Sequence, residues 1–332
     1  MSDIPPDVRA SGVPGREPGV GSNAERLCVR VAVTGATGVI GMPVVSALVS
    51  AGHDVVGMAR SPEKAARLAG LGATAAPADL FDHESLVALF ADADAVCNFA
   101  THIPVGLAAA LPWSWRENDR LRTEGVRRVM AAARVAGVRR VVQESVSFLY
   151  ADQGDRWITE QSPVEITPAT EPASVGESHV QAFQSGPRHG VVLRFGTIVG
   201  DDPLTRWLLH GAERGRPIGL GAPERWTHLV HTDDLGSAVL SALTAPSGIY
   251  NVGAEPVLRG DLVAGYAAAA GRGAARFMGP LLTKLSGPRV EPLTRSLRVS
   301  SEHFTSQTGW TAGRAAFDPS WFDVVTTSGA LR

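Results

Sequence analysis

Lysine and tyrosine are almost absent from this sequence of 332 residues. Only two of its 31 Lys and Arg residues are lysines, Lys64 and Lys284, and it has three tyrosines, Tyr150, Tyr250 and Tyr266. A chain with so few of these side chains has few ways to place a tyrosine beside a lysine. Chemistry that depends on such a pair is therefore restricted from the outset.

Cysteine, long hydrophobic runs and excess charge are also missing. Two cysteines, Cys28 and Cys97, cannot form a disulfide scaffold, which is typical of a reducing compartment. No run approaches the roughly 18 apolar residues of a membrane span, and the N-terminus does not resemble a signal peptide. A formal net charge of −2 lacks the positive surplus of nucleic-acid binders. We therefore expect a cytoplasmic protein with no membrane or nucleic-acid partner.

The sequence does contain a regular alternation of strand-like and helix-like segments. Because 44% of its residues are hydrophobic and 19% are charged, the chain can bury a large core. Apolar, buried-type strands that alternate with helices predict an α/β fold, a doubly wound parallel sheet of the Rossmann type. Strands are expected over 28–33, 53–59, 74–78, 95–100, 140–145, 190–195 and 227–231, and helices over 43–50, 62–71, 83–90, 117–136 and 233–243.

Composition also divides the chain into regions. Residues 1–26 are dense in Pro, Gly and Ser without a hydrophobic period, which predicts a disordered tail. Gly, Pro and Arg are scattered through 211–225 and 271–295, which is typical of a smaller covering domain. We therefore expect a dinucleotide-binding domain over 27–202 and 226–253, with a smaller substrate-binding lid over 203–225 and 254–332.

A glycine-rich turn, Thr34-Gly-Ala-Thr-Gly-Val-Ile-Gly41, follows the first predicted strand and opens a helix. Gly35 permits the tight turn, Gly38 lets the backbone approach a pyrophosphate, and Gly41 allows close helix–strand packing. The helix N-terminus attracts the negative charge. A purely structural turn is the alternative. The pattern favours a dinucleotide site formed by Gly35, Thr37, Gly38, Val39, Ile40 and Gly41.

The end of the second strand bears on the choice of cofactor. An acidic residue about 20 positions after the turn usually holds the ribose hydroxyl of NAD. Here the strand ends in Met58-Ala-Arg60, and Lys64 follows one helical turn later. Two cations suit a 2′-phosphate, so NADP(H) is favoured over NAD(H). A solvated arginine without a role is the alternative.

Further motifs stand after the later strands. They are Ala78-Asp79-Leu80, Asn98-Phe-Ala-Thr101, Ser145-Val-Ser147 with Tyr150, Leu193-Arg-Phe-Gly196, Val230-His-Thr-Asp-Asp234, and Arg295-Ser-Leu-Arg-Val-Ser300 with Gly309-Trp310. Together with the turn Thr-Gly-x-x-Gly-x-x-Gly, this order resembles the extended and atypical short-chain dehydrogenase/reductase superfamily, the NAD(P)-dependent epimerase/dehydratase group. The resemblance spans residues 28–310.

The resemblance implies roles for five residues. Asp79 and Leu80 are expected to border the adenine, Ala100 and Thr101 the cofactor ribose, and Ser145 the nicotinamide. Each also has a structural alternative, since Asp79 can cap the following helix and Ser145 can satisfy backbone groups at a strand end.

The sequence departs from that family in its Tyr-x-x-x-Lys pair, in which lysine lowers the pKa of tyrosine for proton transfer. No tyrosine here precedes a lysine by four residues. One register places Val175 and His179 at the two positions, and the other places Ala169 and Ala173 there. Val146 occupies the position of the usual helper Ser or Thr.

Any proton transfer to or from a substrate must therefore depend on other side chains. The candidates near the strand ends are His102, Ser145, Ser147, Tyr150 and His179. Histidine is the side chain whose ordinary pKa lies closest to neutral pH, so His102 is the first choice for a general acid or base, with a packing or capping histidine as the alternative. Tyr150 can instead be a core side chain.

Two groups of residues indicate what the site binds. His228 and His231 are three residues apart on a predicted strand and should face opposite ways, so no metal site is expected. Tryptophans in predicted loop or lid segments favour an apolar ligand, and some of them are expected to be lid core: Trp113, Trp115, Trp157, Trp207 and Trp226.

Three functions remain open on this sequence. The first is an NAD(P)-dependent oxidoreductase acting on a small apolar or aromatic carbonyl or alcohol, in secondary metabolism. The second is a non-redox isomerase, dehydratase or cyclase on the same fold. The third is an NADP-sensing regulatory protein. The expected partner is a small-molecule substrate, and a homodimer is left open. Fold alone does not choose among these functions.

Overall fold

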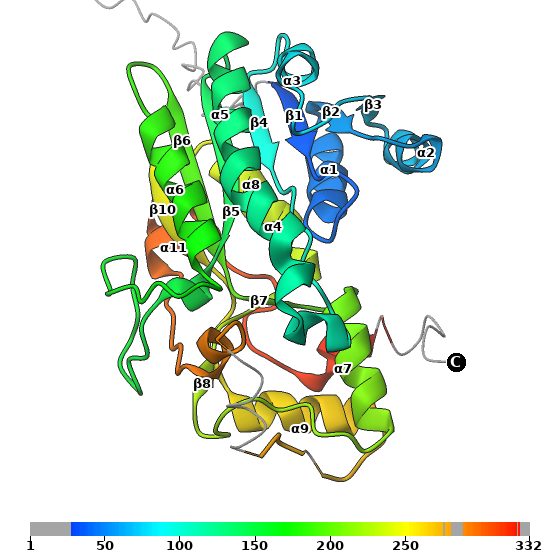
Figure 1. Cartoon of the computed structure of the whole chain (residues 1–332), viewed down its shortest axis with the longest axis vertical. Coiled ribbons are helices and arrows are strands. Elements are labelled where there is room, and N and C mark those ends of the chain that lie inside the picture. Colours follow the sequence, from blue (N-terminus) through cyan, green and yellow to red (C-terminus); the bar gives the residue numbers. More distant parts are fainter. Residues whose placement is uncertain (1–27, 275, 280–287, 324, 326–332) are drawn as a thin grey trace, which may run out of the picture.

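A seven-stranded sheet forms the centre of the protein, in a computed structural model that describes residues 28–274, 276–279, 288–323 and 325 (Figure 1). Its order is β10-β6-β5-β4-β1-β2-β3, and every neighbouring pair of strands is parallel. The doubly wound α/β fold is therefore confirmed. The tail expected over 1–26 lies outside the described residues. The strands are β1 (Arg30–Thr34), β2 (Asp54–Met58), β3 (Thr74–Ala76), β4 (Ala95–Asn98), β5 (Arg140–Val146), β6 (His189–Phe195) and β10 (Gly248–Val252).

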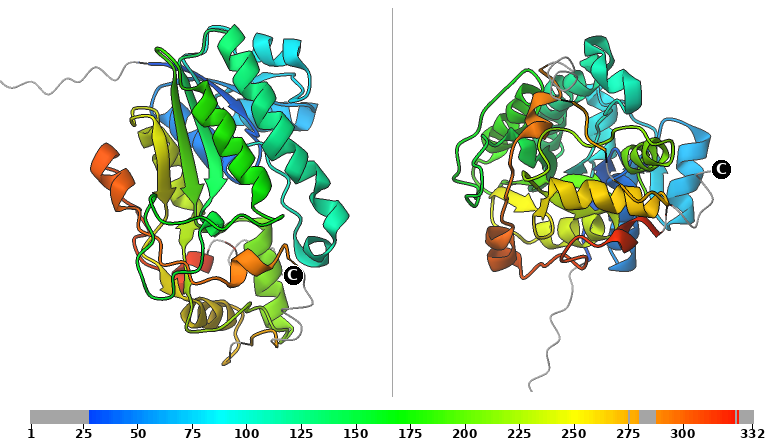
Figure 2. Two further views of the ribbon diagram at one scale, coloured as in Figure 1. Left: turned by 60° about the vertical axis from the view of Figure 1, so that its left-hand side comes forward. Right: turned by 90° about the horizontal axis from the view of Figure 1, so that it is seen from below.

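Helices cover both faces of this sheet (Figure 2). Successive strand residues point to opposite faces, and both faces are apolar because both are buried. One face packs on α1 (Gly41–Ser50) and α8 (Leu235–Ala242), with α2 (Pro62–Gly70) at its edge. The other packs on α3 (His83–Leu89), α5 (Val126–Val135) and α6 (Glu171–Phe183).

The long helix expected over 117–136 consists of three parts. It starts as α4 (Arg116–Arg120), passes through a π-helical turn at Leu121–Gly125, and continues as α5. A π-turn adds a residue within a helix and often marks a functional site. The sequence pattern does not reveal this turn.

The strand expected over 227–231 does not join the main sheet. It divides into β8 (Trp226–Thr227) and β9 (Leu229–His231), which pair with β11 (Val257–Leu258) and β7 (Thr197–Val199) in two small sheets. The chain crosses closely at Gly196, where a Cβ would lie 2.8 Å from the carbonyl carbon of His228. The sheet is completed instead by β10, which sequence reasoning missed.

A smaller lid lies beyond the carboxyl ends of the strands (Figure 1). It contains α7 (Pro203–Glu213) and α9 (Arg259–Ala269), and its core includes Leu209, Tyr266 and Trp321. By contrast, α11 (Glu302–Thr308) packs on β10, with the ring of Phe304 5.4 Å from that of Tyr250. The segment around α11 therefore lies with the sheet, unlike the division expected from composition.

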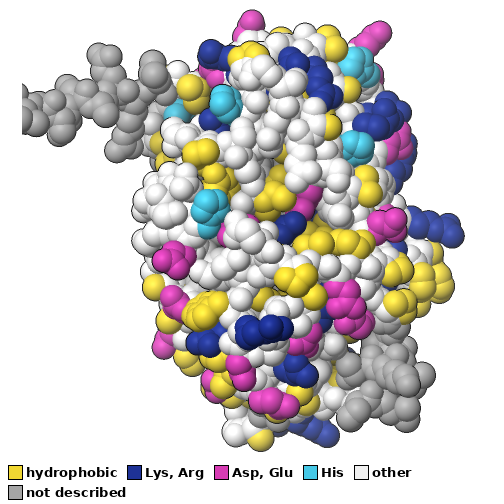
Figure 3. Space-filling view, turned by 90° about the vertical axis from the view of Figure 1, so that its left-hand side faces the viewer, with side chains coloured by type: hydrophobic (Ala, Val, Ile, Leu, Met, Phe, Trp, Pro, Cys, Tyr) yellow, Lys and Arg dark blue, Asp and Glu magenta, His cyan; other side chains and the backbone are white. Residues whose placement is uncertain are grey.

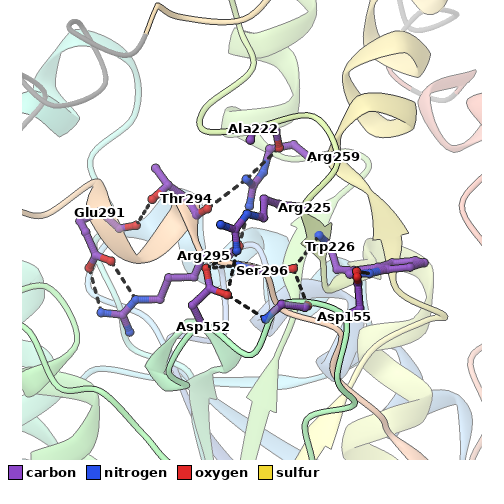
Figure 4. A network of polar contacts seen from close by, with 11 residues as sticks. Asp152, Asp155, Ala222, Arg225, Trp226, Arg259, Glu291, Thr294, Arg295 and Ser296 are labelled. Carbon is purple, nitrogen blue, oxygen red and sulfur yellow. Dashed lines mark hydrogen bonds and ion pairs between the residues drawn. The ribbon is translucent and has the colours of Figure 1, made fainter.

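A polar network ties the lid to the loop after β5 (Figure 4). Asp152 accepts hydrogen bonds from Arg225 at 2.8 and 2.9 Å and from the backbone N–H of Ser296 at 3.2 Å. Nearby, the indole N–H of Trp226 donates to Asp155. These contacts fix the position of the lid over the strand ends.

Acidic and basic side chains are interspersed on the face shown in Figure 3. None of the helices in the described ranges is long and apolar enough to cross a membrane.

Candidate functional site

A cavity of about 510 Å³ lies where the carboxyl ends of the strands meet the lid. Parallel sheets of this type bind ligands at that edge, where the strand order reverses, here between β1 and β4. The cavity therefore extends over both halves of a dinucleotide site. Residues predicted from the sequence that line it are Gly35, Thr37, Gly38, Val39, Ile40, Arg60, Lys64, Leu80, Ala100, Thr101, His102 and Ser145.

Two glycines let the turn pack tightly against the backbone, and the third leaves space beside the turn. Gly35 has φ +66°, and a Cβ there would lie 2.4 Å from the backbone of Phe99. A Cβ on Gly41 would lie 2.1 Å from the carbonyl oxygen of Gly35, so Gly41 packs the turn and does not line the cavity. Gly38 has only that same oxygen nearby, at 3.2 Å. The turn and the N-terminus of α1 thus fit a pyrophosphate.

Arg60 and Lys64 line the cavity, and both follow β2 in the chain. Both are exposed, and their side chains make no ion pair or hydrogen bond with any residue that the structure describes. Ser61 caps α2 by accepting from the backbone N–H of Lys64 at 3.3 Å. The two cations are therefore available to a phosphate.

Leu80 and Asp79 have different environments. Leu80 is buried and lines the cavity, whereas Asp79 does not line it. The carboxylate of Asp79 accepts from the backbone N–H of Phe81 at 2.8 Å, and Asp82 caps α3 by accepting from that of Glu84. Asp79 therefore shapes the loop that carries Leu80.

His102 lies at the rim of the cavity. Its side chain is 59% exposed, and its Nε2 is 4.0 Å from a carboxylate oxygen of Glu117. Its backbone N–H donates to Asn118 at 3.3 Å. The imidazole is therefore accessible to a substrate but is held only loosely.

Ser145 lines the cavity at the end of β5, but its proton is already engaged. Its hydroxyl donates to Glu177 Oε1 over 2.6 Å, and the same carboxylate accepts from Arg194 at 2.6 and 2.8 Å. All three side chains are buried. This saturated network leaves Ser145 able to accept from a ligand, since its only donor is used.

Ser147 and Tyr150 do not line the cavity. The chain turns away after β5, and Tyr150 packs with Ile158, Leu297 and Val299. Its hydroxyl donates to Asn251 at 2.8 Å, and burial raises the pKa of Tyr150 to about 12. Both residues are buried, so the structure places these two predicted acids out of reach of a substrate.

Helix α6, where the family pattern expects the missing pair, contributes no residue to the cavity lining. Ala173 and Glu177 are on its buried side, whereas Val175 and His179 are half-buried. Burial, followed by the charges of Arg127 and Arg134, lowers the pKa of His179.

Arg122 and Glu144 line the cavity and were missed from the sequence. Arg122 Nη2 donates to Glu144 Oε2 at 2.9 Å, with both side chains buried. Burial raises the pKa of Glu144, and the guanidinium of Arg122 opposes this shift. A glutamate near the carboxyl end of a predicted buried strand was the available signal for Glu144, whereas Arg122 depends on the π-turn.

Of the tryptophans, only Trp115 lines the cavity, and its neighbours there include Ile103, Val105, Phe148 and Leu293. These side chains make part of the cavity wall apolar, which suits a small aromatic ligand. His228 and His231 are both buried, and no group of three or more potential metal ligands occurs within the described part of the chain.

Comparison with known proteins gives matches over most of the chain. The model of the NAD dependent epimerase/dehydratase family matches residues 31–253. A 3-diazoavenalumate denitrifying reductase from Streptomyces sp is 30% identical over 311 residues, covering 89% of this chain and 98% of that protein.

Solved structures with the same fold include two sugar-nucleotide complexes. MoeE5 in complex with UDP-glucose and NAD has a TM-score of 0.72 and 24% identity, over 91% of this chain and 100% of that chain. UDP-glucose 4-epimerase from Thermotoga maritima, with UDP-glucose, has a TM-score of 0.74 and 18% identity over the same shares. These two similarities establish the fold.

Proposed function

The chain belongs to the NAD-dependent epimerase/dehydratase family and is an enzyme, and from this premise we propose that it is an NADP(H)-dependent reductase of aromatic diazo compounds. In the proposed reaction the diazonium group of an arene is replaced by hydrogen, and dinitrogen is released. When bound, the reduced cofactor supplies the hydride. The balance is ArN₂⁺ + NADPH → ArH + N₂ + NADP⁺.

The absence of a tyrosine from the cavity is the observation that carries the proposal. Hydride addition to a neutral carbonyl leaves an alkoxide, which requires a proton from a positioned acid. Hydride addition to a diazonium cation gives a neutral aryldiazene. As its C–N bond breaks and N₂ leaves, the N–H hydrogen is transferred to the ring carbon, so no proton from an enzyme acid is consumed. The tyrosines lie elsewhere: Tyr150 bonds Asn251, Tyr250 bonds the carbonyl of Pro246, and Tyr266 is in the lid core.

The reductase relative supports the same reaction. Its name describes reduction of a diazo compound, and this chain aligns with almost its whole length. The apolar wall around Trp115 and Phe148 suits an aromatic ring.

The cofactor preference is part of the proposal. Gly35, Gly38 and the start of α1 would hold the pyrophosphate, and Arg60 and Lys64 would pair with the 2′-phosphate of NADP(H). No acidic residue ends β2, where NAD-binding proteins place one.

The test is turnover of hydroxy- and carboxy-substituted benzenediazonium salts with NADPH, against a control without enzyme. We expect equimolar loss of nicotinamide absorbance and release of ¹⁵N₂ from labelled substrate. Deuterium from 4-deuterated NADPH should appear in the arene. Reduction of aromatic ketones but of no diazonium salt would overturn the proposal. Conversion of a substrate without loss of reduced cofactor would favour an isomerase or cyclase.

A further inference from the structure

The buried carboxylates of Glu144, at the end of β5, and Glu177, on α6, differ in the number of hydrogen bonds that they accept. Glu177 is saturated, because both of its oxygens are bonded by Arg194 and Oε1 also accepts from Ser145. Glu144 accepts one hydrogen bond, from Arg122 to Oε2. Its Oε1 accepts none from any residue within the described ranges. Since Glu144 lines the cavity, this oxygen is available to a ligand.

Arg122 likewise has hydrogen-bond donors without a partner among the described residues. Its Nη2 is its one donor with a partner among the described residues, so Nε and Nη1 are unused although the side chain is 7% exposed. Buried ion pairs normally require further hydrogen bonds to compensate for lost hydration. Arginine and carboxylate also commonly form two parallel hydrogen bonds, as Arg194 does. The single contact therefore leaves both partners with capacity for a third group.

The fold places Arg122 and Glu144 in the half of the crevice where the nicotinamide is expected. Glu144 precedes Ser145 on β5, on the far side of the strand-order reversal from Arg60. The π-turn presents Arg122, and α6 approaches it closely at Gly176, where a Cβ would lie 2.9 Å from the carbonyl oxygen of Arg122. Most of the other residues that line the cavity are apolar, which strengthens the electrostatic field of the pair.

We propose that the Arg122–Glu144 pair is the recognition site for a zwitterionic substrate. Glu144 Oε1 contacts the cationic nitrogen group, and Arg122 contacts an anionic oxygen of the same molecule. The assignment of the cation as a diazonium group rests on the proposed function. An ion pair has no net charge, so a substrate with both charges complements it better than a simple cation or anion does.

A binding experiment tests this without turnover. The probes are 3-(trimethylammonio)benzoate and 3-tert-butylbenzoate, which have the same shape but differ in the positive charge. Calorimetry is done on the protein saturated with NADP⁺. We expect the ammonium probe to bind at least tenfold more tightly than its neutral counterpart. Glu144→Gln should abolish that preference, and Arg122→Met should weaken binding of both probes at least tenfold.

Two controls separate recognition from folding. Breaking one partner of a buried pair is destabilising, whereas removing both charges is often tolerated. The double variant R122M/E144Q should therefore regain thermal stability without regaining the preference. Glu124→Gln, which removes an ion-paired carboxylate within the π-turn but outside the cavity, should retain the preference.

The outcomes distinguish the two proposals. Equal binding of the two probes to the wild-type protein, or a tenfold preference that survives in Glu144→Gln, overturns the recognition site. A wild-type protein that shows the preference but reduces no diazonium salt supports the recognition site and overturns the proposed reaction. Efficient diazonium reduction by Glu144→Gln overturns the recognition site and leaves the reaction standing.

Discussion

The hydroxyl of Ser145 lies 2.6 Å from Glu177 Oε1, to which it donates its only proton. Arg194 binds the same carboxylate, so the three side chains form one saturated buried unit. A serine at the nicotinamide end of the crevice would be a natural proton donor to a substrate. Here that donor is used to hold α6 against β5 and β6, which makes Ser145 chiefly a structural residue.

Ser145→Ala is therefore expected to reduce stability more than activity. Loss of a buried hydrogen bond to a charged group should lower the free energy of unfolding by about 1–3 kcal/mol. In the proposed reaction kcat should fall less than tenfold. Urea denaturation and steady-state kinetics of the same preparation measure both. A loss of kcat above a thousandfold at unchanged stability would make Ser145 a catalytic residue.

His102→Ala distinguishes the diazonium reaction from carbonyl reduction. His102 is the one histidine at the cavity rim, and a positioned acid or base contributes about 10²–10⁴ to a rate that depends on it. Because diazonium reduction requires no acid, kcat should change less than threefold in this variant. A loss of a hundredfold or more would restore His102 as the general acid and favour a carbonyl substrate.

Arg60→Ala is expected to weaken the binding of NADPH but not the binding of NADH. A hydrogen bond between charged groups contributes about 1.5–3 kcal/mol, so the Kd of NADPH should rise about 10- to 100-fold, with that of NADH within threefold. Fluorescence titration of both cofactors measures this. Arg67→Ala is the matched control, since Arg67 is on α2, which begins just after Arg60, but its side chain pairs with Glu63. Equal affinity of the wild-type protein for the two cofactors would refute the preference.

Local signals explain why the cofactor half was predictable. The glycine turn and Arg60 lie within about 30 residues of one another, and their roles follow from backbone conformation and position after a strand. The structure places Arg60 and most residues of the turn around one cavity, whereas Gly41 packs beneath it. The positions of Leu80, Ala100 and Thr101 after strand ends also predicted that they lie near the cofactor, and all three line the cavity.

Long-range packing explains what was not predictable. Tyr150 follows a strand end just as Thr101 does, yet it is buried because residues from the far C-terminal part, Leu297 and Val299, cover it. Arg122 reaches the cavity only because a π-turn changes the phase of its helix, and no local pattern encodes that turn. The substrate half of the site therefore required the three-dimensional structure.

Gly41→Ala should destabilise the nucleotide-binding turn. The added methyl would lie 2.1 Å from the carbonyl oxygen of Gly35, and backbone must shift to accept it. Overpacking of this kind costs about 1–3 kcal/mol, and the displaced turn should also weaken NADPH binding. Gly70→Ala is the control, because a Cβ there meets no atom within 4 Å and should be neutral or slightly stabilising. Equal thermal stability of the two variants would contradict the packing role of Gly41.

His228 should make stability depend on pH below about 6.5. It is fully buried, neither ring nitrogen has a partner in the described structure, and burial lowers its pKa from 6.5 to about 3. Between these values the unfolded chain binds a proton that the folded protein does not. The free energy of unfolding should therefore fall by about 1.4 kcal/mol per unit as pH decreases below 6.5. His228→Asn removes this titration, so urea denaturation from pH 7.5 to 5.0 should give a shallower slope than wild type. Identical slopes would show that His228 accepts a proton in the folded state, and hence that its site admits a charge.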